Sequence, residues 1–521
     1  MNCATDELGL LQHSLSVGPV KASDSSGLHS RVPDVFSGGE YPMLLVYSSL
    51  ISLVFLLLMV SLAATWNRNL QDLSASPKNR SLGGLSLPNF ALGMLGIVME
   101  MYDFGLYGVY AAELGDAFFF RSDRVGTISL TYVTYGSAYL MRPLGGILAG
   151  YIGDCYGRTT VVKSCLAAMV GATSVIGLLP PKGSIGTAAP IIIFIVRLIQ
   201  GLAAGGVPTS FVYVLENAQP SRRCLISCLF GSSMTIGLLL SSAVCTASHS
   251  ILSESSLHWR IPFLSAAALG AVGFWAAREA TESDEYKVAR DAGYVQQRPL
   301  SEAFLVNSNA MLQIIGASSF SVVAMQSLFV WMPTYQSQLR PPPALPYAFT
   351  INTAGYGVLL VMLLLWGWLA DMANYEALML SASAILSIMA FPCSSLFDST
   401  EPKSIFATYV LFVIPFSAWH AVSFRWMFDR VPDVSLRCVT ISIANGVAVA
   451  LFAGPTTFIE TQLAQTSWGV TAPGLYLAAV CFCSFLTIAS TALACLLFPR
   501  PSAEATFSDS LPAGRQFLER W

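Results

Sequence analysis

Long apolar segments alternate with short polar ones along most of this sequence. Each apolar segment is long enough to cross a bilayer as a helix, which takes about 20 mostly apolar residues. The segments that meet this criterion are 43–65, 88–112, 126–150, 160–181, 189–213, 224–246, 258–278, 308–333, 348–370, 377–397, 404–424, 438–463 and 474–498. The pattern therefore predicts an all-α integral membrane protein.

The polar stretches divide the later helices into two groups of six, preceded by one extra apolar helix. The predicted organisation is a polar tail that we expect to be disordered (1–42), the extra segment (43–65), a linker (66–87), a six-helix bundle (88–280), an inter-bundle loop (281–306), a second six-helix bundle (307–498) and a tail (499–521). The extra segment is too long for the core of a secretory signal, which has about 7–15 residues.

A weak internal repeat supports two related halves. Residues 150–154 read Gly-Tyr-Ile-Gly-Asp and follow the second helix of the first six. Residues 367–371 read Gly-Trp-Leu-Ala-Asp and follow the second helix of the second six. Duplicated six-helix halves are typical of secondary transporters, whose substrate site lies between the halves near the middle of the membrane.

The composition agrees with a membrane protein and excludes several classes of function. Of the 521 residues, 54% are hydrophobic and 11% are charged, with a mean hydropathy of +0.61, whereas soluble domains contain about 25% charged residues. A net charge of -3 provides no basic surface for nucleic acid. The 11 cysteines are scattered, and no phosphate-binding loop, nucleophile motif or metal-ligand spacing occurs. We therefore expect no enzymatic activity, no cofactor and no metal.

The positions of Lys and Arg indicate the orientation, because cytoplasmic loops are enriched in both. With the linker 66–87 inside, most of these residues fall on the inside, including those of the loop 281–306. We therefore place that loop and the tail 499–521 in the cytoplasm. We expect the plasma membrane to be the location, since no retention signal is evident.

Two acidic residues lie within the first helix of the twelve. Glu100 and Asp103 are three positions apart and share one helix face, with Tyr107 four positions further on. A carboxylate in a medium of low dielectric constant favours its protonated form, and a nearby arginine opposes this. The pair therefore predicts a proton or substrate site, and structural ion pairs are the alternative.

Two arginines, Arg142 and Arg197, are also embedded in apolar runs. A charge at this depth is costly and normally faces a partner or a watery cavity. The planar guanidinium matches a carboxylate, so a substrate with a carboxyl group would fit. An internal ion pair with Glu100 or Asp103 is the competing interpretation.

The segment after Gly150 has the composition of a tight turn at the cytoplasmic end of its helix. It holds one acid and one base, and the acid would be stabilised near a helix N-terminus by the helix dipole. We predict that it latches the halves in one conformation; a loop that only sets topology is the alternative. The predicted latch residues are Gly150, Asp154, Gly157, Arg158 and Asp371.

Several motifs occur in a distinctive order. They are Glu-Met-Tyr-Asp-Phe-Gly-Leu-Tyr-Gly (100–108), Arg-Pro-Leu-Gly-Gly (142–146), Gly…Gly-Asp…Gly-Arg (150–158), Arg…Gln-Gly…Gly-Gly (197–206), Tyr-Val-Leu-Glu (213–216), Arg-Arg (222–223), Trp-Arg-Ile-Pro-Phe-Leu (259–264), Trp-Met-Pro-Thr-Tyr (331–335) and Arg437. Over about 88–498 the sequence resembles the metabolite–proton symporters of the major facilitator superfamily, a branch that includes bacterial proline/betaine, oxoglutarate and shikimate carriers.

This resemblance implies the major facilitator fold, with two six-helix bundles, and proton-coupled symport of a small carboxylated or zwitterionic metabolite by alternating access. Glu100 and Asp103 would bind the proton. The predicted substrate-binding residues are Tyr102, Tyr107, Arg142, Arg197 and Gln200. The expected partners are the small-molecule substrate, protons and the lipid bilayer, with no nucleic acid, and we expect a monomer.

The sequence also departs from the family pattern. Val207 stands where the family usually has Glu, and Met101 replaces the usual Trp. Asn374 and Tyr375 occupy the positions of Gly and Arg in the second copy of the repeated loop. The loss of one acid leaves an uncoupled facilitative carrier as an alternative. A transporter-like sensor that binds its ligand without moving it is the other.

Overall fold

Every regular element in the described part of the chain is a helix. The computed structural model describes residues 86–120, 124–252, 257–293, 299–340, 345 and 347–497. The predicted N-terminal tail, the extra segment 43–65 and the C-terminal tail lie outside these residues. For the part that is described, the all-α prediction is confirmed.

The helices follow one another in two long series joined by two short helices. The first series is α2 (Leu87–Val109), α3 (Ala111–Phe118), α4 (Arg124–Tyr156), α5 (Arg158–Leu178), α6 (Lys182–Ile185), α7 (Ala188–Ala204), α8 (Val207–Glu216), η1 (Pro220–Arg222), α9 (Arg223–Leu252), α10 (Arg260–Leu264) and α11 (Ala266–Glu279). The joining helices are α12 (Asp284–Asp291) and α13 (Pro299–Val306). The second series is α14 (Ser308–Met325), η2 (Gln326–Trp331), α15 (Met332–Thr334), η3 (Tyr335–Leu339), α16 (Ala348–Met372), α17 (Tyr375–Ser394), η4 (Ser395–Asp398), α18 (Pro402–Arg430), α19 (Arg437–Ala464) and α20 (Thr471–Leu497).

Within the described residues, 11 helical stretches are long and apolar enough to cross a membrane. Each coincides with one of the predicted apolar segments. α4 occupies the remaining segment of the two predicted bundles, 126–150, but it is not among the 11. Its 33 residues include several charged and hydroxyl-bearing side chains, which lower its hydropathy.

Large apolar side chains point outward along these helices. Leu312, Ile388 and Phe458 are 68%, 77% and 67% exposed. Soluble proteins rarely expose extended apolar surfaces. The exposed side chains therefore agree with helices that face lipid.

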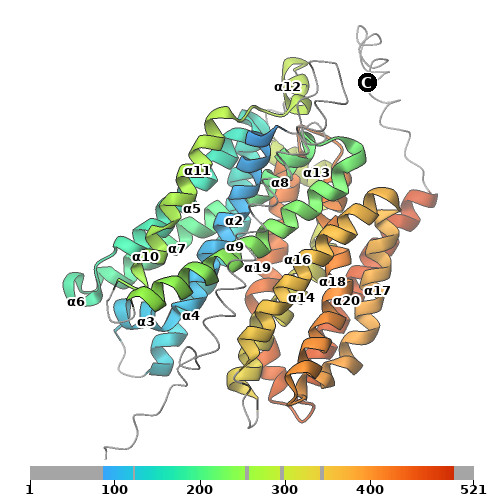
Figure 1. Cartoon of the computed structure of the whole chain (residues 1–521). Coiled ribbons are helices and arrows are strands. Elements are labelled where there is room, and N and C mark those ends of the chain that lie inside the picture. Colours follow the sequence, from blue (N-terminus) through green and yellow to red (C-terminus); the bar gives the residue numbers. More distant parts are fainter. Residues whose placement is uncertain are drawn as a thin grey trace, which may run out of the picture. The chain divides into compact units, whose positions relative to one another are not determined.

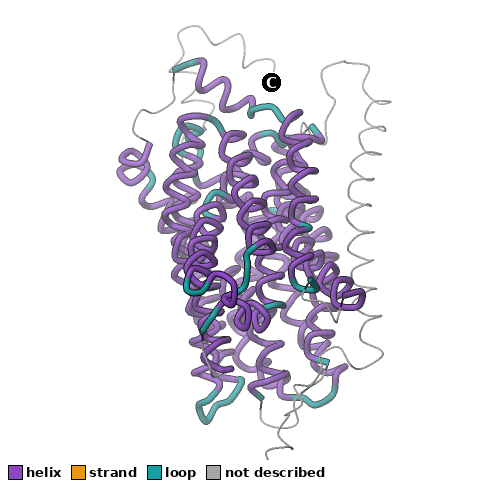
Figure 2. The backbone as a smooth tube through the Cα atoms, turned by 90° about the vertical axis from the view of Figure 1, so that its left-hand side faces the viewer, coloured by secondary structure: helices purple, strands orange, loops and turns teal. Residues whose placement is uncertain are grey.

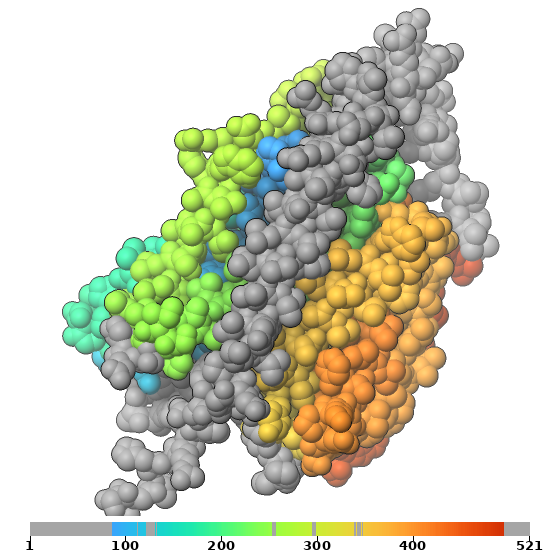
Figure 3. Space-filling view, viewed as in Figure 1, coloured from blue at the N-terminus to red at the C-terminus, as the bar shows by residue number. Residues whose placement is uncertain are grey.

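The two series of helices form two groups that lie beside each other. In Figure 1, α2 to α11 occupy the left of the view and α14, α16, α17, α18 and α20 the right, with α12 at the top. The tube drawn in Figure 2 shows helices joined by short loops. The same division is visible on the surface in Figure 3, where yellow-green atoms lie on the left and yellow to orange atoms on the right. We refer below to the first half (α2 to α11), the second half (α14 to α20) and the α12 end of the molecule.

Glycines allow α4 of the first half to approach α19 of the second. A Cβ atom at Gly146 would collide with the backbone of Ser442, and one at Gly150 with the backbone of Val439. From the other side, a Cβ at Gly446 would lie 2.8 Å from the carbonyl oxygen of Arg142. Small residues let membrane helices pack at backbone distance, so these glycines define the seam between the halves.

The structure corrects the predicted turn after Gly150. α4 continues through Asp154 to Tyr156, so Gly150 is helical. The chain turns only at Gly157, whose φ of 107° lies in the left-handed region that favours glycine. The prediction was wrong because glycines that serve helix contacts have the same composition as glycines that serve turns.

We expect Gly150→Ala to lower the rate of uptake about tenfold and to reduce thermal stability. The added methyl group meets backbone atoms of α19, and overpacking of this kind costs about 1–3 kcal/mol. Uptake into proteoliposomes and the midpoint of thermal unfolding measure the two effects. Gly136→Ala on the same helix is the matched control, because its Cβ would meet nothing within 4 Å. Equal behaviour of the two variants would contradict the importance of this close packing between α4 and α19.

Candidate functional site

A fully buried network surrounds Asp103 in the first half. The Nη1 atom of Arg197 donates to Asp103 Oδ2 at 2.6 Å. Gln200 Nε2 and Thr173 Oγ1 both donate to Asp103 Oδ1, at 2.6 and 2.8 Å. All four side chains are 0% exposed. Both oxygens of Asp103 are therefore occupied, and helices α2, α5 and α7 meet at this carboxylate.

A second buried ion pair joins α2 to α4. The Nη2 atom of Arg142 donates to Glu100 Oε1. The other carboxylate oxygen of Glu100 and the Nε atom of Arg142 are buried and have no partner. Glu100 is therefore only half satisfied, whereas Asp103 is saturated.

Aromatic rings enclose the two guanidinium groups. The Arg197 Cζ atom lies 4.0 Å from the centre of the Tyr107 ring and 5.3 Å from that of Tyr135. The Arg142 Cζ atom lies 5.2 Å from the centre of the Tyr139 ring. Cation–π contacts of this kind stabilise a desolvated arginine. The Nε and Nη2 atoms of Arg197 have no hydrogen-bond partner, so they face rings instead of acceptors.

This buried cluster, which we call the central cluster, contains most of the residues predicted to bind a proton or substrate. Its members are Glu100, Asp103, Tyr107, Tyr135, Tyr139, Arg142, Thr173, Arg197 and Gln200. Tyr102 is not among them: its hydroxyl donates to the carbonyl of Pro262 at 2.9 Å and contacts Ser265. A hydrogen bond joins the cluster to the second half, because Gln326 Nε2 donates to the Tyr139 hydroxyl at 3.1 Å.

At the α12 end, Asp154 lies against the first turn of α19. Its carboxylate oxygens accept from the backbone N–H groups of Cys438 and Val439, at 3.1 and 2.8 Å. These N–H groups have no partner within their own helix, and a carboxylate there is stabilised by the helix dipole. An acid of the first half thus binds a helix of the second.

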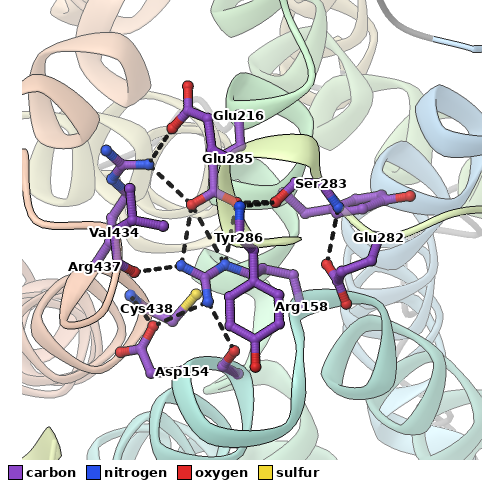
Figure 4. Close-up of polar contacts among 12 residues, drawn as sticks. Asp154, Arg158, Glu216, Glu282, Ser283, Glu285, Tyr286, Val434, Arg437 and Cys438 are labelled. Carbon is purple, nitrogen blue, oxygen red and sulfur yellow. Dashed lines mark hydrogen bonds and ion pairs between the residues drawn. The ribbon is translucent and has the colours of Figure 1, made fainter. Parts of the chain in front are cut away.

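Arg158 holds the same seam from the other side (Figure 4). It is 0% exposed, and its guanidinium donates to both oxygens of Glu216. It also donates to the carbonyl oxygens of Gly153, at 3.0 Å, and of Val434 in the second half. Arg158 of the first half therefore holds a backbone carbonyl of the second half.

Glu216 lies between two arginines from different halves. Besides Arg158, it accepts from Arg437 Nη1 at 2.9 Å and from the Ser283 hydroxyl at 2.6 Å. Arg437 also donates to the carbonyls of Val431 and Pro432, both at 3.0 Å. One buried carboxylate thus neutralises charges from both halves.

The joining helix α12 covers this group. Glu285 accepts from Arg223 Nη2 at 2.9 Å and from Arg437 Nη1 at 2.8 Å, so it connects the two halves. The Tyr286 ring covers Arg158, with its centre 4.4 Å from the Cζ atom. Burial raises the pKa of the Tyr286 phenol further above its ordinary value of about 10, so the ring is neutral at physiological pH. Glu282 accepts from the backbone N–H and the hydroxyl of Thr159, at 3.1 and 2.8 Å.

The second copy of the repeated loop makes the equivalent contact from the second half to the first. Asp371 of α16 accepts from the backbone N–H groups of Cys224 and Leu225, at 2.9 and 3.0 Å, in the first turn of α9. Each half therefore supplies a carboxylate to a helix N-terminus of the other. Asn374 caps its own helix α17, accepting from the backbone of Glu376 at 3.0 Å.

Sequence reasoning underrated three residues of this end. Glu216 and Arg437 were noticed only through the family resemblance, and Glu285 was one charge among many in the loop. A usable signal was present: residues 221–224 read Ser-Arg-Arg-Cys and residues 435–438 read Ser-Leu-Arg-Cys. Each pattern opens a helix whose first turn receives a carboxylate from the other half.

The described residues contain no group of three or more His, Cys, Asp or Glu side chains that could hold a metal ion. What they provide is a buried charged cluster in the first half and a charged seam between the halves. This arrangement supports binding and a change of conformation.

Comparisons with known proteins point in one direction. A family model described as Major Facilitator Superfamily matches residues 93–455. The chain is 28% identical to a shikimate transporter from Escherichia coli over 430 residues, which cover 80% of this chain and 97% of that protein. It is also 28% identical to a proline/betaine transporter from the same species, covering 75% of this chain and 81% of the relative. Its fold is similar to that of the proton:xylose symporter XylE bound to 6-bromo-6-deoxy-D-glucose, with a TM-score of 0.63 at 16% identity, covering 77% of this chain and 95% of that chain.

Proposed function

Since this chain belongs to the Major Facilitator Superfamily, we propose that it carries a small carboxylated or zwitterionic metabolite across the membrane together with a proton, by alternating access. Membership makes it an integral, multi-pass transporter of the plasma membrane and not an enzyme. We further propose that α4 is a twelfth span beside the 11 apolar ones. The protein would then consist of two six-helix halves.

The incomplete hydrogen bonding of the buried arginines carries this proposal. Arg142 Nε and Arg197 Nε and Nη2 are desolvated donors without acceptors. Leaving such donors unpaired costs about 1–3 kcal/mol each, and more for charged groups. A ligand carboxylate supplies the missing acceptors in a geometry that suits a guanidinium. Proline, betaine and shikimate, which the names of the two relatives mention, all contain a carboxylate.

The half-satisfied pair offers a way to couple the substrate to a proton. In the absence of substrate, Arg142 neutralises Glu100. A substrate carboxylate that binds Arg142 removes this partner, and Glu100 then favours its protonated form because it is buried. Asp103 is saturated by three donors, so we assign it to orienting Arg197. This proposal divides the two predicted proton sites into one that binds the proton and one that positions an arginine.

The seam at the α12 end supports alternating access. The structure shows the halves joined there by Asp154, Glu216, Glu285 and Asp371. Opening this end breaks these contacts, and closing it restores them. We therefore assign the latch role to this seam.

Uptake into proteoliposomes tests the function. We expect an inward proton gradient to accelerate uptake of one or more members of a panel of amino acids, betaines and organic acids. Glu100→Gln should weaken the acceleration and retain exchange of labelled for unlabelled substrate. Exchange without any response to the gradient in the wild type would indicate an uncoupled facilitative carrier. Saturable binding without exchange would indicate a sensor.

A further inference from the structure

One buried carboxylate of the second half differs from all the others. The buried carboxylates among the described residues are those of Glu100, Asp103, Asp154, Glu216 and Glu460. The first four each contact an arginine. Glu460, on α19, is 0% exposed and forms no ion pair with any described residue.

The hydrogen bonding of Glu460 is incomplete. Its Oε1 atom accepts from the Ser327 hydroxyl of η2, and its Oε2 atom is buried without a partner. An ionised carboxylate held away from water with a single neutral donor is costly, and such a group normally becomes neutral. The environment therefore favours the protonated form of this carboxyl group.

Glu460 is in register with residues of α19 that pack against the first half. Val449 and Ala453 of α19 pack with Tyr139 of α4. With 3.6 residues per turn, residue 460 lies about 20° from each of them around the helix axis, nearer the end opposite α12. The contacts of Glu460 itself are with Ser327 of η2 and Tyr476 of α20, both in the second half.

The η2 segment contacts both Glu460 and the central cluster. Ser327, the hydrogen-bond partner of Glu460, follows Gln326, which donates to the Tyr139 hydroxyl at 3.1 Å. The Tyr139 ring in turn lies over Arg142. Two consecutive residues of η2 thus contact Glu460 on one side and the ring that covers Arg142 on the other.

The titratable group that faces Glu460 from the neighbouring helix α20 is Tyr476. On α4, the ionisable groups beside Gln326 of η2 are Tyr139, which accepts its hydrogen bond, and Arg142 under the Tyr139 ring. The segment η2 itself contains no ionisable side chain. Tyr476 also lines a cavity of about 440 Å³ with Leu463 and Trp468, where α19 ends and α20 begins. This cavity lies at the end of α19 away from α12, and Tyr476 separates it from Glu460.

We propose that Glu460 is a second proton-binding site, located in the second half of the protein. It takes a proton from the medium at the end opposite α12 and becomes a neutral acid. It releases that proton to water when the halves rearrange and the α12 end opens, so this proton crosses in addition to the one bound by Glu100. The proposal rests on the alternating access proposed above, and it places a coupling acid outside the arginine-paired cluster.

Two measurements on Glu460→Gln test this site. Infrared spectroscopy of the purified protein in lipid should show the carbonyl stretch of a protonated carboxylic acid at neutral pH, and the variant should lose this band. In proteoliposomes the variant should retain substrate exchange and lose at least part of the acceleration by a proton gradient. Glu401→Gln is the matched control, because Glu401 is exposed in the described second half and its loss should change neither result.

The outcomes separate this proposal from the proposed function. If wild-type uptake responds to the gradient and Glu460→Gln responds equally, the second site is wrong while the proposed function stands. If the infrared band is unchanged in the variant, Glu460 is not the protonated group. If wild-type uptake ignores the gradient, proton coupling itself fails, and the infrared band still decides whether Glu460 holds a proton. Ser327→Ala should shift the band without removing it, which identifies the acid even if Glu460→Gln does not fold.

Discussion

Replacing Arg197 with glutamine is expected to abolish uptake of a carboxylated substrate and to destabilise the protein. A hydrogen bond to a charged group contributes about 1.5–3 kcal/mol, so losing one contact to the substrate lowers affinity roughly 10- to 150-fold. The variant also leaves the Asp103 carboxylate buried without its cation. Breaking a buried pair in this way costs about 3–5 kcal/mol. Uptake and the thermal unfolding midpoint measure the two effects.

A double variant separates the two roles of Arg197. Asp103→Asn together with Arg197→Gln removes both charges, and the two amides can hydrogen bond to each other and to Gln200. We expect the unfolding midpoint to recover toward that of the wild type, while uptake stays abolished. Recovery of uptake as well would mean that Arg197 serves only to neutralise Asp103.

Replacing Glu216 with glutamine is expected to open the α12 end. Arg158 and Arg437 then lose the carboxylate between them and face each other as like charges. A loss of about 3–5 kcal/mol for a broken buried pair exceeds the roughly 2.7 kcal/mol that brings a 99:1 equilibrium to equal populations, which is half of the change needed to invert it to 1:99. Because these contacts exist only while the seam is closed, the cost falls mainly on the closed conformation.

Cys438 reports on this change. Its side chain is 0% exposed beside Asp154 at the start of α19, so a maleimide should label it slowly in the wild type and much faster in Glu216→Gln. Mass spectrometry of the Cys438 peptide distinguishes it from the other cysteines. Glu376→Gln is the matched control, since it breaks an ion pair with Arg430 inside one half. Equal protection of Cys438 in all three proteins would rule out the latch role.

Helices, which follow from patterns along the chain, could be predicted from the sequence. Pairs of residues that are far apart in the sequence could not. The apolar segments gave the helices, because each span must be apolar over a membrane's thickness. Glu100 and Asp103 were recognised as needing arginines, because an unpaired charge at this depth is costly. Which arginine pairs with which acid depends on the rotation and depth of three helices, so the assignment of Arg142 to Glu100 required coordinates.

Local composition misled at the turn after Gly150. The glycines before Gly157 resembled a turn, although Gly150 and Gly153 lie inside α4 and approach α19. Asn374 departs from the loop pattern as the sequence indicates, and its N-cap contact with α17 required coordinates. The same residue types serve turns, caps and close helix contacts, and only the position of the neighbouring helix distinguishes these uses.

The crossed carboxylates at the α12 end have a consequence for mutational tolerance. Asp154 and Asp371 bind backbone N–H groups of the opposite half, and every residue except proline presents such a group. The positions that supply these N–H groups, which we call the receiving positions, can therefore exchange side chains of similar size without loss of the contact. Neither aspartate can be exchanged, because its carboxylate makes the contact. In a saturation library selected for uptake, we expect substitutions to accumulate at the receiving positions 225 and 439 and to be depleted at 154 and 371, with proline absent from all four.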